Sequence, residues 1–440
     1  MQEHNKRLDG DAPKAARQPR VQSNKFGGDG MQLNMTRFLI VLIVFFVFLP
    51  ACSKDHNSDN SSNVSFLDQA MTQSEIDALN PGDPAYAMVD RENGIQMVPI
   101  TLGYRYTIGS SDYLTFKDDD LQFGYGDSGS PILNSEGKTI GALSGTYGGN
   151  NIVITPISAM LTSVGINTLA ALAAVSRSSS LQGAGIEQHK LAWFATGVDA
   201  EGKSMLRSAG IPVSDFDPHL LLSNGAAAYV PKAAAVAMYS VTAGHSMAVV
   251  PFNGPLVNIF AIGTATYTID NDKIIAFGHS LNWDGQPTFN MPVTPAKVVQ
   301  FVRDPLYGSF KLAVPVGEIM GGIVQDRSNG ILISRAANID WIELKINAGG
   351  ATTTHRVCRL DDQDLLASFI GSGLNSVVRD QFDVAYPGDR QTSITVTYIG
   401  GSTNTTDLGL VNWSGSGGFT VWYSVVNEIS TVNKIEITVN

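Results

Sequence analysis

One serine in this chain lies in a glycine-containing sequence pattern that suits a nucleophile. The hexapeptide GDSGSP at residues 126–131 precedes the apolar strand pattern PILN and places glycines on both sides of Ser128. The glycines let the backbone turn tightly, expose the hydroxyl and direct main-chain N–H groups toward a developing oxyanion, with Gly126 and Ser128 as the expected donors. This pattern indicates acyl transfer. A Gly/Asp/Ser turn that only joins two strands is the alternative, and by composition alone it is the commoner explanation.

A serine hydroxyl needs a base within reach, and histidine is the usual one. His279 follows the apolar pattern KIIAFG and opens the polar segment HSLNWDGQP. A strand end can hold a base still while it faces a cleft, so position favours His279. His245 in AGHSMAVV also follows a glycine and is the competitor, and a structural histidine is the alternative for either. Beyond the predicted signal peptide, the histidines without flanking glycines are His56, His189, His219 and His355.

The order of the two motifs differs from that of chymotrypsin-like enzymes, in which the histidine and the aspartate precede the serine. After the apolar segment near the N-terminus, only His56 precedes Ser128, and it lies in a polar stretch. We therefore do not expect an ordinary chymotrypsin-like domain. Catalytic geometry does not depend on chain order, so a downstream base such as His279 remains acceptable.

The elements that must position these residues are mostly strands. The 44 glycines and the many Val, Ile and Thr residues favour a mostly β architecture with few, short helices. Runs that predict strands are MVPITLGYRYTI, YLTFK, GSPILN, KTIGALSGTY, NIVITPI, VAMYSV, MAVVPF, LVNIFAIGTATYTI, KIIAFG, GILISR, WIELKI, THRVCRL, SITVTYI, FTVWYSV and KIEITV. Spacing and turn signals predict helical segments at residues 68–82, 157–174, 293–303 and 362–378.

Changes in composition divide the chain into six segments, of which the Ser- and Gly-rich stretch SRSSSLQGAG marks one linker. The predicted segments are residues 1–51 (upstream extension and signal peptide), 52–84 (tether and short helix), 85–175 (first half of the body, with the serine motif), 176–186 (linker), 187–337 (second half, with the histidine motif) and 338–440 (β-rich accessory domain).

The segment near the N-terminus predicts export and a lipid anchor. The apolar run at residues 38–50 follows Arg37, is short for a membrane span and matches the core of a signal peptide. It is followed by Ala51 and Cys52, which resembles a bacterial lipobox whose cysteine is acylated and binds the membrane. Ser53, a residue other than Asp at the next position, suggests the outer membrane. An ordinary signal peptide with a chance cysteine is the alternative.

Charge and cysteine content exclude several function classes. The net charge is −11, and from Cys52 onward 36 acidic residues outweigh 22 basic ones. Nucleic-acid binding, which needs clustered Lys and Arg, is therefore not expected. The sequence has no HExxH, no GxxxxGK[ST] and no paired-cysteine cluster, so we expect no metal or nucleotide cofactor. If Cys52 is acylated, Cys358 has no disulfide partner, and the alternating HRVCRL predicts a buried thiol.

Three separated stretches resemble the SpoIVB peptidase family of serine endopeptidases. GDSGSPILNSEGKTIGALSG followed by VITPISAML is similar to the family's serine motif, GTATYTIDNDKIIAFGHS to its histidine motif, and GSFKLAVPVGEIMGGIVQDRSNGI to the segment after it. The likeness covers residues 85–337 and implies Ser128 as nucleophile and His279 as general base, with His245 in a non-catalytic stretch. Asp127 stands where the family usually has Met, and the serine motif comes first, as in longer bacterial relatives.

A third catalytic residue is left open. Asp118, Asp119 and Asp120 lie shortly before the serine, as an acidic residue does in the family, and Asp326 in QDRSNG is another option. Runs such as KDDD are more often solvated loops.

The resemblance implies a trypsin-like β-barrel-type peptidase body that needs no cofactor and cleaves another exported protein, with self-cleavage as a further expectation. The alternative is an inactive envelope lipoprotein that keeps the fold and acts as a binding or structural module. The oligomeric state is left open.

Overall fold

The computed structural model describes residues 69–108, 111–147, 150–166, 186–188, 191–215, 241–281, 291–303, 308–384 and 386–440, which all belong to one compact unit. The predicted signal segment, the lipidation site Cys52, the tether, nearly all of the linker and the VAMYSV strand apart from its last residue lie outside these residues. Within the described part of the chain, none of the helices has both the length and the apolar character that a membrane crossing requires.

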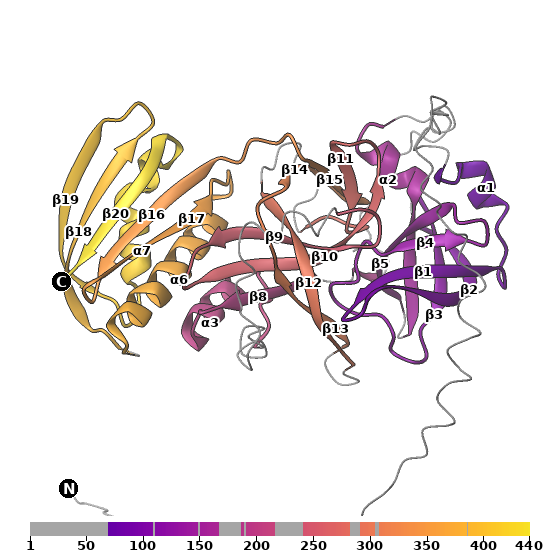
Figure 1. The fold of residues 1–440 in the computed structure, drawn as a ribbon, viewed down its shortest axis with the longest axis horizontal. Helices are drawn as coiled ribbons and strands as arrows, with labels where there is room; N and C mark the ends of the chain where they lie inside the picture. Colours follow the sequence, from indigo (N-terminus) through magenta and orange to yellow (C-terminus); the bar gives the residue numbers. More distant parts are fainter. Residues whose placement is uncertain are drawn as a thin grey trace, which may run out of the picture. The chain divides into compact units, whose positions relative to one another are not determined.

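The first half of the body is a closed antiparallel barrel of six strands (Figure 1). Its strands are β1 (Pro84–Arg91), β2 (Gly94–Ile108), β3 (Ser111–Lys117), β4 (Pro131–Asn134), β5 (Thr139–Tyr147) and β6 (Asn151–Pro156). They pair in the order β1-β2-β3-β6-β5-β4, and β4 returns to β1. Apolar side chains that alternate along these strands fill the interior. The helices α1 (Gln73–Asp77) and α2 (Ile157–Ser163) and the short strand β7 (Ile186–Gln188) belong to this half.

The second half also closes on itself. Strands β9 (Ser246–Asn253), β10 (Asn258–Thr268), β11 (Lys273–Ala276), β12 (Pro292–Val302), β14 (Gly321–Arg327) and β15 (Gly330–Ser334) pair antiparallel in the order β9-β10-β11-β15-β14-β12, and β12 returns to β9. Strand β8 (Ala192–Thr196) pairs with β10, and β13 (Phe310–Pro315) pairs with β12. The helix α3 (Ala200–Ser208) follows β8. The mostly β, trypsin-like barrel architecture expected from the sequence is thus confirmed.

The C-terminal segment continues the sheet of the second half. Its elements are β16 (Trp341–Ala348), β17 (Ala351–Cys358), α6 (Gln363–Phe382), β18 (Asp389–Tyr398), β19 (Thr403–Asn412), α7 (Gly417–Val425), the 3-10 helix η4 (Val426–Thr431) and β20 (Val432–Val439). The strand order is β17-β16-β20-β18-β19, with β16 and β20 parallel, and β17 pairs with β9. Helices α6 and α7 pack together along one face of this sheet (Figure 1). One apolar core runs from the second half into this segment.

One predicted helix is a strand. Residues 293–303 were expected to be helical because their apolar residues recur every three to four positions, but they lie in β12. β-Branched residues dominate the segment, and Pro295 removes a backbone donor that a helix would use. Three neighbouring strands, β9, β13 and β14, supply backbone partners that no local pattern reveals.

One predicted strand is a helix. The run FTVWYSV alternates like a strand, yet it forms most of α7, in which Val421, Trp422 and Val425 are buried on one side. A short apolar run is compatible with the repeat of a strand and with that of a helix, and tertiary packing decides which of the two forms. Here a side chain at Gly418 would lie 2.3 Å from the carbonyl oxygen of Gly371, so paired glycines allow α7 to approach α6 closely.

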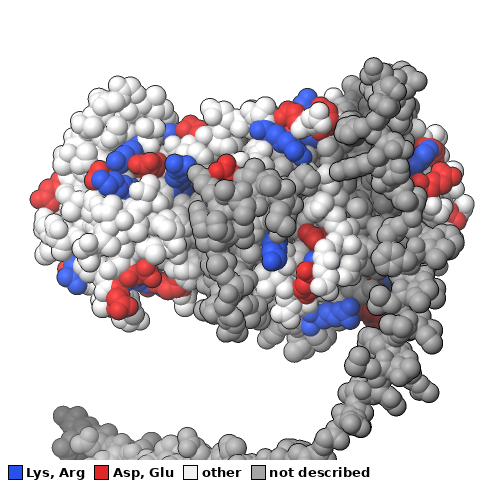
Figure 2. Space-filling view, in the orientation of Figure 1, with Lys and Arg blue, Asp and Glu red and all other residues white. Residues whose placement is uncertain are grey.

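Charged side chains lie on the surface in small groups. On the face drawn in Figure 2, acidic and basic residues are interspersed among uncharged ones over the described part of the chain. The described part of this face therefore carries charges of both signs rather than a single-sign field.

His355 supports a prediction about stability. Its ring is fully buried in β17 beside Phe252, and neither ring nitrogen has a hydrogen-bond partner among the described residues. Burial lowers the pKa of His355 to about 4, below its ordinary 6.5. The unfolded chain therefore binds more protons between pH 6.5 and 4, so stability falls as the pH drops through this window. His355→Leu should remove about 3 kcal/mol of that pH dependence, measured by denaturant unfolding at a series of pH values. Equal slopes in the two proteins would contradict this account.

Candidate active site

The loop that carries Ser128 joins β3 to β4 and is shaped by two glycines. Gly126 and Gly129 have φ values of 88° and 90°, a region that residues with a side chain rarely adopt. The N–H of Gly129 donates to the carbonyl of Leu143 at 2.8 Å, and the N–H of Ser130 donates to the carbonyl of Asp127 at 2.8 Å. These two amides are used inside the fold, and Gly126 and Ser128 remain the predicted oxyanion donors.

His279 follows the end of β11, as the sequence predicts. The chain turns there through Phe277 and Gly278, whose φ values are 71° and 69°. Glycine tolerates this conformation, whereas Phe277 is strained in it and is held by its surroundings. Thr155 of the first barrel donates its hydroxyl hydrogen to the Gly278 carbonyl at 3.0 Å. A hydrogen bond from the first half therefore holds the turn that positions His279.

Ser128 and His279 meet across the two barrels. The Oγ of Ser128 lies 2.9 Å from Nε2 of His279, and Nδ1 of His279 lies 2.6 Å from the carbonyl oxygen of Ser280. Because a carbonyl can only accept, Nδ1 carries the proton and Nε2 is left as the acceptor for the serine hydroxyl. This is the arrangement that a general base requires. The predicted convergence of these two side chains is confirmed.

Strand β10 is the structural link between the two residues. The N–H of Thr264 donates to the Ser128 carbonyl at 2.9 Å, and the Thr264 hydroxyl donates to the Gly126 carbonyl at 3.1 Å. The hydroxyl of Thr266 donates to the Gly129 carbonyl at 2.8 Å. Since β11 pairs with β10, the strand that leads to His279 lies beside the strand that holds the Ser128 loop.

Among the four carboxylates that the sequence offers for a third role, Asp326 contacts the histidine loop. It is fully buried in β14 and accepts the N–H of Leu281 at 2.8 Å, two residues after the histidine. Asp118 instead accepts the N–H groups of Gln122 and Phe123 at 2.8 and 2.9 Å. Burial raises the pKa of Asp118 against the effect of these bonds. Asp118 therefore shapes its own loop.

The other described histidines and the free cysteine lie apart from this pair. His245 makes a local contact, with Nδ1 2.9 Å from the Thr242 hydroxyl. His355 is in β17, and Cys358 is a buried free thiol in the same strand, as predicted. Burial raises the pKa of the Cys358 thiol, so it is protonated and inert at neutral pH. His56, His189 and His219 lie outside the described residues.

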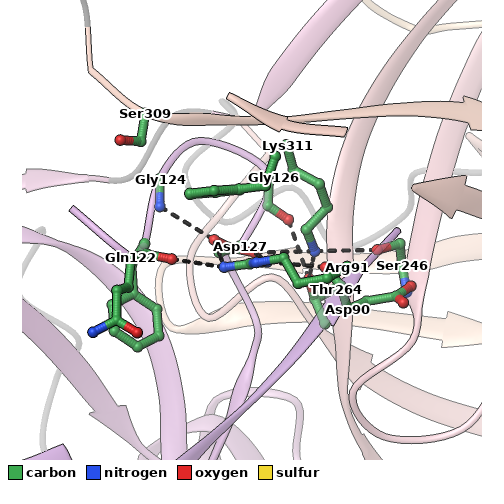
Figure 3. A network of polar contacts seen from close by, with 12 residues as sticks. Asp90, Arg91, Gln122, Gly124, Gly126, Asp127, Ser246, Thr264, Ser309 and Lys311 are labelled. Atoms are coloured by element: carbon green, nitrogen blue, oxygen red, sulfur yellow. Dashed lines mark hydrogen bonds and ion pairs between the residues drawn. The ribbon is translucent and has the colours of Figure 1, made fainter. Parts of the chain in front are cut away.

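A buried charge cluster beside the nucleophile was not predicted (Figure 3). The carboxylate of Asp127 pairs with Arg91 at the end of β1 and with Lys311 in β13, and all three side chains are at least nine-tenths buried. Burial by itself raises the pKa of Asp127, but the two cations outweigh it and hold the pKa below its usual value. The sequence signal was a lysine inside the apolar strand FKLAVP, since a buried lysine needs an anionic partner.

The described residues include no group of three or more His, Cys, Asp or Glu side chains that could hold a metal ion.

Comparison with known proteins adds little to this geometry. The chain matches no protein-family model and no curated protein. Two solved structures show a faint likeness, a putative exotoxin 3 (13% identity, TM-score 0.15, covering 44% of this chain and 91% of that one) and a superantigen-like protein (6% identity, TM-score 0.15, covering 44% and 92%), both from Staphylococcus aureus. At such scores neither likeness bears on what this chain does.

Proposed function

We propose that this chain is a serine endopeptidase of the SpoIVB peptidase type, anchored in the cell envelope by lipid on Cys52. The observation that supports it most is the 2.9 Å contact between Ser128 Oγ and His279 Nε2, with Nδ1 fixed on a carbonyl. Two residues 151 positions apart are brought to hydrogen-bond distance by two strained or glycine-dependent turns. Backbone strain of this kind clusters at functional sites.

The reaction follows from these atoms. His279 Nε2 takes the proton of Ser128 as Oγ attacks the carbonyl carbon of a peptide bond, and the oxygen that becomes negative is bound by the N–H groups of Gly126 and Ser128. The proton on Nε2 then passes to the leaving amine as the C–N bond breaks. Water, deprotonated by the same nitrogen, hydrolyses the acyl-enzyme and restores Ser128. Asp326 contributes by fixing the histidine loop through Leu281.

The substrate class rests on the resemblance and on the export signal. An exported protein is the expected substrate, and cleavage of the chain by itself is a further expectation. The lipid on Cys52 would hold the enzyme at a membrane surface, most simply the outer membrane, because Ser53 follows it.

One observation favours a second candidate, an inactive envelope module on the same fold. Ser128 is 0% exposed and His279 is 3% exposed. A peptide must reach Oγ for hydrolysis, whereas a purely structural hydrogen bond needs no access. The two candidates therefore differ in whether the Ser128 hydroxyl can be reached by a reagent.

A fluorophosphonate probe tests this directly, because it phosphonylates only activated serines. We expect the folded chain to be labelled and Ser128→Ala to lose the label completely, as read by gel fluorescence and peptide mass spectrometry. Ser130→Ala is a matched control, since its buried hydroxyl has no hydrogen-bond partner among the described residues and its removal should leave labelling intact. An unlabelled wild-type protein, or a label that persists in Ser128→Ala, would favour the inactive module.

A further inference from the structure

The residue directly before the nucleophile is held by two cations from different parts of the fold. Arg91 binds Asp127 through both carboxylate oxygens, at 2.7 and 3.0 Å, and its Nη1 also donates to the Asp90 carbonyl. The Nζ of Lys311 lies 3.2 Å from the same carboxylate. Arg91 ends a strand of the first barrel, and Lys311 lies in β13, which pairs with the second.

Lys311 is satisfied as a charged group. Its Nζ lies 2.9 Å from the Thr264 hydroxyl oxygen and 3.1 Å from that of Ser246, in addition to Asp127 (Figure 3). Three acceptors match the three hydrogens of an ammonium group. Burial lowers the pKa of Lys311, while the charge of Asp127 raises it. Asp90 lies nearby and accepts the N–H of Ser246 at 2.9 Å, so two acids and two bases share this buried region.

Asp127 in turn fixes the turn of the loop. Its Oδ2 accepts the N–H of Gly124 at 3.2 Å, and its own N–H donates to the Gly124 carbonyl at 3.0 Å. Arg91 also donates to the Gln122 carbonyl at 2.7 Å, so the same cation binds both the aspartate and the loop before it. The peptide unit after Asp127 carries the Ser128 N–H. The Gly126 N–H belongs to the peptide unit of the Tyr125 carbonyl, which accepts the N–H of Lys311 at 2.8 Å.

We propose that Arg91 and Lys311 are positioning residues, which act through Asp127 to set the direction of the Gly126 and Ser128 N–H groups. This inference rests on the proposed peptidase function, because those amides are its oxyanion donors. Oxyanion donors must lie within about 2.7–3.1 Å of the developing charge, and the loss of one slows acyl transfer about 10²–10³-fold. A buried carboxylate that loses a cation is left uncompensated, and it moves toward a new partner or solvent, taking the loop with it.

The ion pairs also join the two halves at the point where the chemistry occurs. Arg91 reaches the loop from β1, while Lys311 and its partner Thr264 reach it from β13 and β10. The N–H of Lys311 also donates to the Tyr125 carbonyl at 2.8 Å, which places the lysine backbone against the same loop. The oxyanion donors are therefore correctly aimed only when both halves are docked.

The test compares Asp127→Asn, Lys311→Met and the double variant in the full chain, with the maximal rate and the half-saturating concentration of fluorophosphonate labelling measured across pH. We expect each single variant to lower the maximal rate about 10²-fold with little change in half-saturation. The maximal labelling rate of the double variant should fall by about the same factor, since the two residues act as one unit. The double variant also removes both charges of the pair, so it keeps the test usable if one single variant does not fold.

Two comparisons separate positioning from other roles. A direct electrostatic effect on His279 would move the pH midpoint of labelling in opposite directions in Asp127→Asn and Lys311→Met, because they remove opposite charges, whereas positioning lowers the rate in both. Arg379→Met removes another buried cation, which pairs with Glu201 at 2.7 Å, and it should lower stability but not the labelling rate. Wild-type rates in the Asp127 and Lys311 variants would overturn this inference and leave the peptidase proposal standing, whereas an unlabelled wild type would overturn the proposal itself.

Discussion

Replacing His279 with alanine should slow fluorophosphonate labelling of Ser128 by about 10²–10⁴-fold, the range that general-base catalysis contributes. The contact between Nε2 and Oγ is 2.9 Å, and the substitution removes the imidazole that would accept the hydroxyl proton. The rate constant of labelling, followed over time at fixed pH, measures the effect. Circular dichroism and thermal unfolding establish that the variant is folded.

His245→Ala is the matched control for this experiment. His245 also follows a glycine, but its ring contacts Thr242 in a local turn, so its removal should leave the labelling rate within about twofold of wild type. If the two variants slowed labelling equally, the base assigned from the geometry would be wrong. A folded His279→Ala protein with the wild-type rate would show that the 2.9 Å contact has no chemical role.

Gly129→Ala should lower the free energy of unfolding by about 3–5 kcal/mol, a large effect for a single methyl group. A Cβ there would lie 2.2 Å from the Thr264 carbonyl oxygen and 2.4 Å from the Phe277 nitrogen. Both atoms are backbone of β10 and of the turn before His279, so neither can shift without opening the contact between the barrels. The φ of 90° adds a strain that glycine avoids. Chemical denaturation measures the loss.

Gly137→Ala separates the two causes. Gly137 has a similar φ of 83°, but a Cβ there meets nothing within 4 Å, so only the backbone term of about 1 kcal/mol applies. A difference of several kcal/mol between the two variants reports the steric clash alone. Equal losses would show that the loop can move away from β10, and that the close packing of the site is not required for stability.

Strand content was predictable because alternation and β-branched residues are local signals. Two of the errors, β12 and α7, came from short apolar runs that fit both periods. Their structure depends on partners far away in the chain, such as the three strands beside β12. The 20-residue α6 was predicted because it is long enough for its period to be unambiguous.

The candidate site was predictable in its two central residues. Neighbouring glycines identify Ser128 and His279 in the sequence, because both lie at turns with a backbone conformation that residues with a side chain rarely adopt. The sequence could not choose between Asp118 and Asp326. The residue type alone does not show whether a carboxylate accepts hydrogen bonds from its own loop or from another segment. The sequence also missed the ion pairs of Arg91 and Lys311, whose partner Asp127 is 36 positions from one and 184 from the other.

The sequence by itself determined that the chain is mostly β and that a glycine-framed serine and a strand-end histidine are its chemical candidates. These are properties of residue type and short spacing. The tertiary structure alone decided that β10 holds the serine loop while β11 presents the histidine, and that the buried charges around Asp127 neutralise one another. Both arrangements depend on the contact between the two barrels. Hydrogen bonds and buried ion pairs form only when their atoms lie within a few ångströms, so these contacts exist only in the folded chain.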